Sequence, residues 1–288
     1  MSTTLGEIYN PAIPGLPPKD VVGRLCKKKG FDSNTLTYST EGNTFFIKYN
    51  NVTMEEAHAQ VFFRQKSRES NATFRIPEVY HAFIVGEGGG TGRGYTYIVM
   101  EHIEIDFERT ASDEQRAQAI SELISIPPPP GVFGSFSGGS YRHHFFRDSE
   151  PPIPFSSAAE LEYYLNRCLE WYNGVTGRQD KVDFSTEPLP CYYADVHPSN
   201  FPIDKHGQLW VIDFDQAGVL PSSFMSYAIA AHPKKRLPVH IRKTIPLPKS
   251  SNLGPLGRAT YVLKTVHNAF DIPRDNRTEA DAESPPTG

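Results

Sequence analysis

Residues 191–218 read CYYADVHPSNFPIDKHGQLWVIDFDQAG, and this stretch determines the fold that we expect for the chain. Residues 201–203 and 209–212 are apolar, and the polar sequence Asp204-Lys205-His206-Gly207 lies between them. This pattern predicts two short strands joined by a turn. Because a hairpin brings its two ends together, polar residues that precede the first strand and follow the second should meet at one place.

Carboxylate and amide side chains occur at the open end of this predicted hairpin. Asp195 and Asn200 precede it, and Asp213 and Asp215 follow it. A carboxylate can accept the proton of an attacking hydroxyl, and oxygen ligands bind Mg²⁺ beside nucleotide phosphates. The spacing Asp-x-x-x-x-Asn, followed by a strand that ends in Asp, is that of the kinase catalytic loop and its second metal-binding Asp. A polar hairpin with surface carboxylates is the alternative interpretation.

This stretch resembles the aminoglycoside phosphotransferase and choline kinase-like family. The loop of that family typically reads His-Gly-Asp-Leu-His-Pro-Gly-Asn, and its next strand ends in Ile-Asp-Phe or Ile-Asp-Trp. The matching residues here are Asp195, His197, Pro198, Asn200, Ile212, Asp213 and Phe214. The chain departs from the family at Tyr193-Ala194, where His-Gly is usual. The resemblance spans residues 44–231, and a Gly-Ser-x-x-Gly-Gly run before Arg142 resembles fungal-type members.

The resemblance implies an α+β, bilobal, protein-kinase-like fold. Residues 1–103 would form a small antiparallel-sheet N-lobe that binds the nucleotide, after an irregular N-terminal lead-in. Residues 104–274 would form a mostly helical C-lobe with the catalytic hairpin and the acceptor site, and residues 275–288 are predicted to be a disordered tail. Alternating and amphipathic patterns predict strands at 34–39, 44–49 and 95–100, and helices at 20–29, 112–126, 158–172, 224–231 and 256–270.

Two charged residues near the start of the chain match further kinase features. Lys48 lies in a predicted strand, where the resemblance implies contact with the α- and β-phosphates of ATP; an ordinary strand-edge lysine is the alternative. Glu56 would pair with Lys48, and Glu55 is the second choice. Thr53 and Glu56 also have the spacing of a capping box, which would occupy Glu56 locally, and both interpretations stay open.

The segment after residue 85 contains a glycine-rich run and the predicted hinge between the lobes. Residues 86–94, GEGGGTGRG, contain no Gly-x-Gly-x-x-Gly and precede a strand, so they predict a hairpin loop and not a phosphate-binding loop. By resemblance, Glu101 and Ile103 would contact adenine through backbone groups. His143-His144 has no third ligand at a suitable spacing, which favours loop histidines over a metal site.

Together these residues predict a small-molecule kinase that uses ATP and Mg²⁺. Asp195 would accept the proton of the acceptor hydroxyl, Asn200 and Asp213 would bind Mg²⁺, and Lys48 would position the phosphates. Asp215 would be a further metal or acceptor contact, or merely a solvated carboxylate. The residue types do not indicate which hydroxyl compound is the acceptor.

Three other functions are compatible with parts of the pattern. A pseudokinase that binds nucleotide without turnover is favoured by Tyr193 and by the missing glycine-rich loop. A metal-dependent hydrolase would use Asp195-x-His197 and Asp213-x-Asp215 as its ligands. A protein kinase is disfavoured, because no Ala-Pro-Glu segment follows Asp213.

Composition limits the partners that we expect. The 288 residues are 38% hydrophobic and 12% aromatic, which allows a sizeable core, and the net charge of −4 argues against nucleic acid. No apolar run is long enough to span a bilayer, so no membrane partner is expected. The cysteines, Cys26, Cys168 and Cys191, are far apart and odd in number, which favours a reducing, cytoplasmic location. The sequence does not indicate an oligomeric state.

Overall fold

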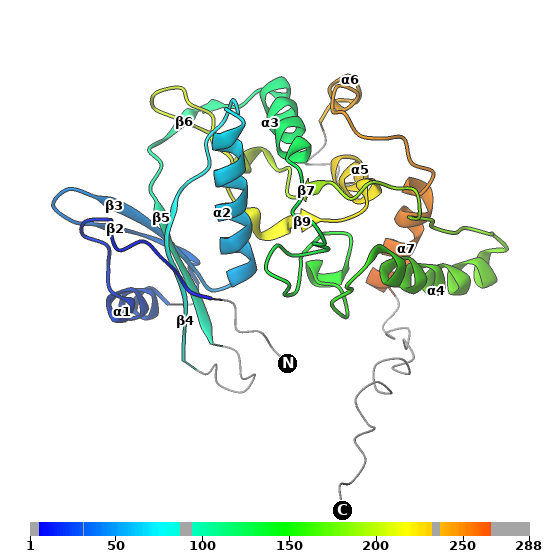
Figure 1. The fold of residues 1–288 in the computed structure, drawn as a ribbon, viewed down its shortest axis with the longest axis horizontal. Helices are drawn as coiled ribbons and strands as arrows, with labels where there is room; N and C mark the ends of the chain where they lie inside the picture. Colours follow the sequence, from blue (N-terminus) through cyan, green and yellow to red (C-terminus); the bar gives the residue numbers. More distant parts are fainter. Residues whose placement is uncertain (1–5, 31, 87–93, 232–236, 266–288) are drawn as a thin grey trace, which may run out of the picture.

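The computed structural model describes residues 6–30, 32–86, 94–231 and 237–265 (Figure 1). An antiparallel five-stranded sheet has the strand order β1-β4-β5-β3-β2. Its strands are β1 (Ile8–Tyr9), β2 (Thr35–Ser39), β3 (Thr44–Tyr49), β4 (Val79–Val85) and β5 (Tyr95–Glu101). Helix α1 (Lys19–Lys29) packs on one face of this sheet and helix α2 (Met54–Glu69) on the other.

Alternation along β3 determines which side chains each face of the sheet presents. Phe45, Ile47 and Tyr49 are buried with the apolar side of α1. Phe46 packs in the layer on the α2 side, and Lys48 reaches α2 itself. Because successive side chains of a strand point to opposite faces, Lys48 is directed away from α1 and toward α2. The alternation therefore places the positive charge of Lys48 on the α2 side of the sheet.

The remaining elements lie on the other side of α2 or at its C-terminal end (Figure 1). The helices are α3 (Asp113–Ser125), α4 (Ala158–Thr176), α5 (Ser222–Ala231), α6 (Val239–Arg242) and α7 (Leu253–Thr265). The strands are β6 (Ile105–Thr110), β7 (Cys191–Tyr193), β8 (Pro202–Asp204) and β9 (Ala217–Val219), which pair as β6-β8 and β7-β9. Short 3₁₀ helices are η1 (Arg147–Ser149), η2 (Pro198–Asn200) and η3 (Phe214–Gln216).

The predicted hairpin is present, although only its first strand is regular. The Trp210 N–H donates to the Pro202 carbonyl at 2.9 Å, and Gly207, with φ of 84°, closes the turn. β8 also pairs with β6. Residues 209–212 form isolated bridges and no continuous strand. On the side away from β8, their backbone exchanges hydrogen bonds with the single residue Arg75. The prediction of a second regular strand is therefore wrong.

Most of the predicted helices and strands are observed near their expected positions. α4 continues beyond the predicted end at residue 172 to Thr176, and Gly177 caps it with a left-handed φ of 70° that is typical of a helix C-terminus. Residues 87–93 of the predicted loop, 266–270 of the last predicted helix and the predicted tail 275–288 lie outside the described residues. Among the helices of the described residues, none combines the length and apolar composition that a membrane span requires.

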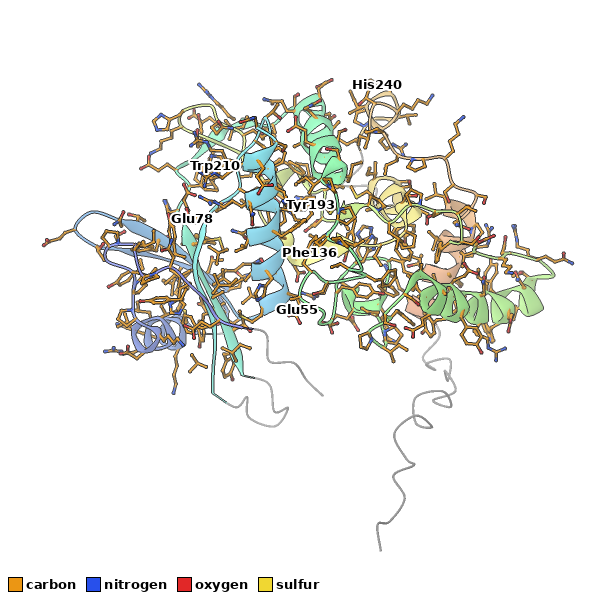
Figure 2. All side chains as sticks on the ribbon, viewed as in Figure 1. Glu55, Glu78, Phe136, Tyr193, Trp210 and His240 are labelled. Carbon is orange, nitrogen blue, oxygen red and sulfur yellow. The ribbon has the colours of Figure 1, made fainter. Side chains whose placement is uncertain are left out.

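Aromatic packing joins α2 to the helical part of the molecule. Phe63 is fully buried and stacks on Phe214 with a centroid distance of 5.3 Å. Phe62 stacks on Phe136 with a centroid distance of 4.2 Å, and the Phe136 and Phe63 rings pack edge to face. Figure 2 shows Phe136 beside α2. α2 therefore belongs to the apolar core of the helical part as well as to that of the sheet, and the predicted lobe boundary at residue 103 stays a prediction.

We expect Phe63→Ala to lower the free energy of unfolding by about 3–5 kcal/mol, because it leaves a cavity between α2 and η3. Phe107→Ala is the matched control, since 91% of the Phe107 surface is exposed, and it should change stability by less than about 0.5 kcal/mol. Urea denaturation followed by circular dichroism measures both values. Equal effects of the two substitutions would contradict this description of the core.

Candidate active site

Three charged side chains from three separate elements meet at one point. The Lys48 ammonium lies 2.6 Å from Glu56 Oε1 and 2.9 Å from Asp213 Oδ1. Lys48 comes from β3, Glu56 from α2, and Asp213 from the residue that precedes η3. The side chain of Glu56 is 1% exposed, that of Lys48 17% and that of Asp213 34%. The cluster is thus buried on the α2 side and accessible at Asp213.

The start of α2 shows which glutamate pairs with Lys48. The Glu56 N–H donates to the hydroxyl of the N-cap residue Thr53 at 3.1 Å, so this half of the predicted capping pattern is present. The Glu56 carboxylate contacts Lys48 instead of completing a capping box. Glu55 lies against Gly139, at a place that a larger side chain would fill, and Figure 2 shows Glu55 at the beginning of α2. The second-choice pairing through Glu55 is therefore not the one observed.

Burial and mutual charge determine the protonation of this cluster. Burial raises the pKa of Glu56 to about 7, although the Lys48 ammonium opposes this rise. Burial alone would lower the pKa of Lys48, but Glu56 and Asp213 together keep it above its ordinary value. Lys48 therefore stays charged, and Glu56 is the member of the pair that titrates near neutral pH.

Glu56 should make protein stability depend on pH in a defined direction. Its pKa rises from 4.5 to about 7 on folding, so the folded state binds this proton more tightly than the unfolded state. The contribution is complete below pH 4.5 and is lost as the pH rises through 7. Relative to Glu56→Gln, which does not titrate, the wild type should lose up to about 3 kcal/mol across this window. Urea denaturation of both proteins over this range measures the difference, and parallel pH profiles would contradict the prediction.

Asp213 has a left-handed backbone conformation that a residue other than glycine rarely adopts. Its φ is 66° and its ψ is 75°, a conformation that costs on the order of 1–3 kcal/mol. Its neighbours are fixed on both sides. The Ile212 N–H donates to the Asn200 carbonyl at 3.0 Å, and the Phe214 ring is fully buried. The surrounding structure therefore stabilises the conformation that brings Asp213 to Lys48.

Tyr193, which replaces the histidine of the resembled family, stabilises this turn directly. Its hydroxyl donates to the Ile212 carbonyl at 2.5 Å, and its ring packs against Phe214 with a centroid distance of 5.3 Å. The side chain is completely buried, and burial raises the pKa of its hydroxyl well above the ordinary value. Figure 2 shows Tyr193 beside α2. The unusual residue thus supports the loop from inside the core.

Removing the Tyr193 hydroxyl should destabilise the protein by about 1–3 kcal/mol, because the Ile212 carbonyl loses its buried donor. Tyr193→Phe makes this change without altering the ring. Tyr163→Phe serves as the control, since the Tyr163 side chain is 52% exposed and should contribute less than about 0.5 kcal/mol. The free energy of unfolding in urea measures both, and a neutral Tyr193→Phe would show that the hydrogen bond adds nothing.

The loop that contains Asp195 and Asn200 is closed by its own hydrogen bonds. The Asn200 amide nitrogen donates to the Asp195 carbonyl at 3.0 Å, and the Asn200 N–H donates to the His197 carbonyl at 3.0 Å. Arg116 of α3 donates to the Val196 carbonyl at 2.7 Å. With its amide nitrogen used in this way, Asn200 has its Oδ1 atom on the other side, where it accepts a long bond of 3.4 Å from the Ser199 hydroxyl.

Asp215 forms an ion pair that sequence reasoning did not predict. Arg142 Nη1 lies 2.8 and 2.9 Å from the two carboxylate oxygens of Asp215, whose side chain is 17% exposed. Burial raises the pKa of Asp215, and Arg142 opposes that rise. The solvated-carboxylate interpretation is therefore wrong. The only signal in the sequence was the run Gly-Ser-x-x-Gly-Gly before Arg142, which identifies no partner.

The predicted loop histidines have structural roles. His143 is completely buried; its Nε2 pairs with the Phe224 carbonyl at 3.2 Å, and its Nδ1 accepts the Phe145 N–H at 3.0 Å. Burial keeps the pKa of His143 well below its ordinary value. Within the described ranges, no group of three or more His, Cys, Asp and Glu side chains is arranged to bind a metal. His197 uses Nδ1 for a 2.6 Å contact with the Ser199 hydroxyl.

The donor set at Asp213 and Asn200 nevertheless fits Mg²⁺ that arrives with a nucleotide. Mg²⁺ is commonly bound by one or two protein oxygen ligands together with substrate phosphates, so a complete protein cage is not required. Asp213 contacts Lys48 through Oδ1, and its side chain keeps 34% of its surface exposed. The backbone hydrogen bond from Ile212 to Asn200 places Asp213, the next residue, at the same end of the hairpin as Asn200.

The predicted hinge has both bonded and unbonded backbone groups. The Glu101 N–H donates to the Glu78 carbonyl at 2.8 Å and is not open to adenine, whereas the Ile103 carbonyl accepts from the Ile105 N–H at 3.0 Å and keeps a second lone pair. The Ile103 N–H has no hydrogen-bond partner among the residues described. A cavity of about 500 Å³ lies elsewhere, between α2 and the β1 edge of the sheet, and contains none of the predicted site residues.

Comparison with known proteins shows distant structural likenesses only. No family model matches the chain, and no curated protein matches it. A structure described as a fructosamine-3-kinase from Haemophilus somnus matches over 79% of this chain and 76% of its own, with 14% identity and a TM-score of 0.47. A spectinomycin phosphotransferase, solved with ADP and spectinomycin, matches over 81% and 77%, with 12% identity and a TM-score of 0.47. A choline kinase from Streptococcus pneumoniae matches over 80% and 78%, with 12% identity and a TM-score of 0.41. All three TM-scores are below 0.5, so these likenesses assign neither a family nor an activity to the chain.

Proposed function

We propose that this protein is an ATP- and Mg²⁺-dependent phosphotransferase of kinase-like, bilobal fold that transfers the γ-phosphoryl group to a hydroxyl of a small molecule. The observation that carries the proposal is the contact of Lys48 with both Glu56 and Asp213. In phosphoryl transfer a strand lysine, oriented by a helix glutamate, contacts the phosphates beside a metal-binding Asp. The same arrangement here gives each of the three residues a role.

The proposed reaction requires little covalent chemistry from the protein. Lys48 binds the α- and β-phosphates, and Ile103 contributes its backbone N–H to adenine. Asp195 accepts the proton of the acceptor hydroxyl while that oxygen bonds to the γ-phosphorus, the bond from this phosphorus to the β-phosphate oxygen breaks, and ADP leaves. Asn200 and Asp213 would hold Mg²⁺, which would neutralise charge on the phosphates. Asp195 begins the loop whose last residue is Asn200, so base and metal ligand are fixed together.

Turnover should depend on Asp195 while nucleotide binding does not. We expect Asp195→Asn to lower kcat by about 10²–10⁴-fold, since the general base is lost, and to keep the thermal shift that Mg-ATP produces. Asp20→Asn is the control, because Asp20 is exposed on α1, and it should leave both values unchanged. ADP release with a panel of hydroxylated metabolites, together with differential scanning fluorimetry, measures these quantities.

The two measurements separate the proposal from its rivals. A Mg-ATP thermal shift without turnover on any acceptor would indicate the nucleotide-binding pseudokinase, and the absence of both would contradict a nucleotide site at Lys48. A hydrolase that uses His197 as a metal ligand should lose all activity in His197→Asn, whereas the phosphotransferase should be weakened through the loop that His197 and Ser199 stabilise.

A further inference from the structure

One segment, residues 131–146, contacts both α2 and the turn that contains Asp213. Gly134 exchanges two backbone hydrogen bonds with Val219 of β9, at 2.7 and 2.8 Å. Phe136 of the same segment stacks on Phe62 of α2 at 4.2 Å. The segment therefore connects the helix of Glu56 with the strand that follows Asp213, and it forms no helix or strand of its own within these residues.

The far end of this segment supplies Arg142, whose position is fixed by its surroundings. The side chain is 15% exposed, and Nη1 contacts both oxygens of Asp215. The Arg142 carbonyl accepts the buried Tyr192 hydroxyl at 2.9 Å. The buried Nε atom has no hydrogen-bond partner in the described structure and lies 3.6 Å from Glu150 Oε1. The guanidinium is thus mainly committed to Asp215.

Asp215 and Gln216 receive polar contacts from this segment and from Ala194, the residue after β7. Asp215 is bound by Arg142, and the Gln216 side chain accepts the His144 N–H at 2.7 Å. The Gln216 carbonyl accepts the Ala194 N–H at 2.8 Å. These contacts restrain the backbone immediately after the strained φ of Asp213.

Charge gives Arg142 a second effect on the same turn. Asp215 and Asp213 are both carboxylates, and they lie two residues apart in the same turn. Without Arg142, Asp215 would lose its ion-pair partner two residues from the proposed Mg²⁺ ligand and could reorient toward the cation. An ion pair that fixes Asp215 removes this competition and keeps the turn in one conformation.

We propose that Arg142 is a positioning residue for the proposed metal ligand Asp213: by binding Asp215 it fixes the turn that directs Asp213 toward Lys48 and the cation. This inference rests on the proposed function, and it assigns a task to a segment outside the catalytic hairpin. Groups that orient metal ligands from outside commonly change metal affinity by about 10–100-fold when they are removed.

The test compares Arg142→Gln with Arg147→Gln, an exposed arginine nearby whose carboxylate partner lies 3.9 Å away. With a non-hydrolysable ATP analogue present, the Mg²⁺ concentration that gives half of the maximal thermal shift should rise about tenfold in Arg142→Gln. It should stay within about twofold of wild type in Arg147→Gln. Arg142→Lys keeps the positive charge and should restore most of the Mg²⁺ response that Arg142→Gln loses. If Arg142→Gln folds poorly, Arg142→Lys still tests the role of the charge.

A second pair of variants shows whether Arg142 acts through Asp215. In an Asp215→Asn background, Arg142→Gln should change the Mg²⁺ requirement by less than about twofold, because the partner is already absent. An equal effect in both backgrounds would overturn the inference, and so would an Arg142→Gln protein with the Mg²⁺ requirement of Arg147→Gln.

Amide hydrogen exchange without any ligand separates this inference from the proposed function. Residues 213–219 should exchange faster in Arg142→Gln than in Arg147→Gln, and unchanged exchange would overturn the positioning role. If wild type shows no thermal shift with Mg²⁺ and nucleotide, the proposed function fails. Faster exchange in Arg142→Gln would then still support the fixing of the turn, whereas the assignment of Asp213 as a metal ligand would be overturned.

Discussion

A buried ammonium group between two carboxylates is the interaction on which the rest of this structure depends. Lys48 comes from the sheet, Glu56 from α2 and Asp213 from the turn after the hairpin; Glu56 and Lys48 are largely removed from water, whereas Asp213 stays partly exposed. A buried ion is costly by several kcal/mol unless it is paired. The sheet, the helix and the turn must therefore stay close together, and apolar packing alone would not specify that geometry.

The turn at Asp213 is the second constraint, because its backbone conformation is unfavourable in isolation. Its stability comes from neighbours that have little freedom to move: Tyr193 contacts the carbonyl before Asp213, and the Phe214 ring is enclosed on the other side. A site in which the surroundings already carry the strain needs little rearrangement when a ligand binds.

Particular residues show how far prediction from sequence could go. Alternation in β3 correctly indicates that Lys48 and Phe45 face opposite sides of the sheet. The pattern at Thr53 and Glu56 supports both a capping box and a pairing of Glu56 with Lys48. In the structure the Glu56 N–H donates to Thr53, as in a capping box, while the Glu56 carboxylate contacts Lys48. Residues 209–212 look like a strand because they are apolar, but they form only isolated bridges, to the first half of the hairpin and to Arg75 before β4.

Local order was therefore encoded in short patterns: the periodicity of strands and helices, the turn at Gly207 and the relative spacing of Asp195, Asn200 and Asp213. The pairing of side chains that are far apart in the chain was not encoded in such short patterns. Lys48 and Asp213 are 165 positions apart, and Arg142 and Asp215 are 73 apart. Hydrogen bonds and steric clashes between neighbouring residues limit the local conformation. Helices and strands therefore leave a periodic pattern of apolar residues in the sequence. An ion pair between distant residues depends on how all the intervening elements pack, and only the folded chain contains that information.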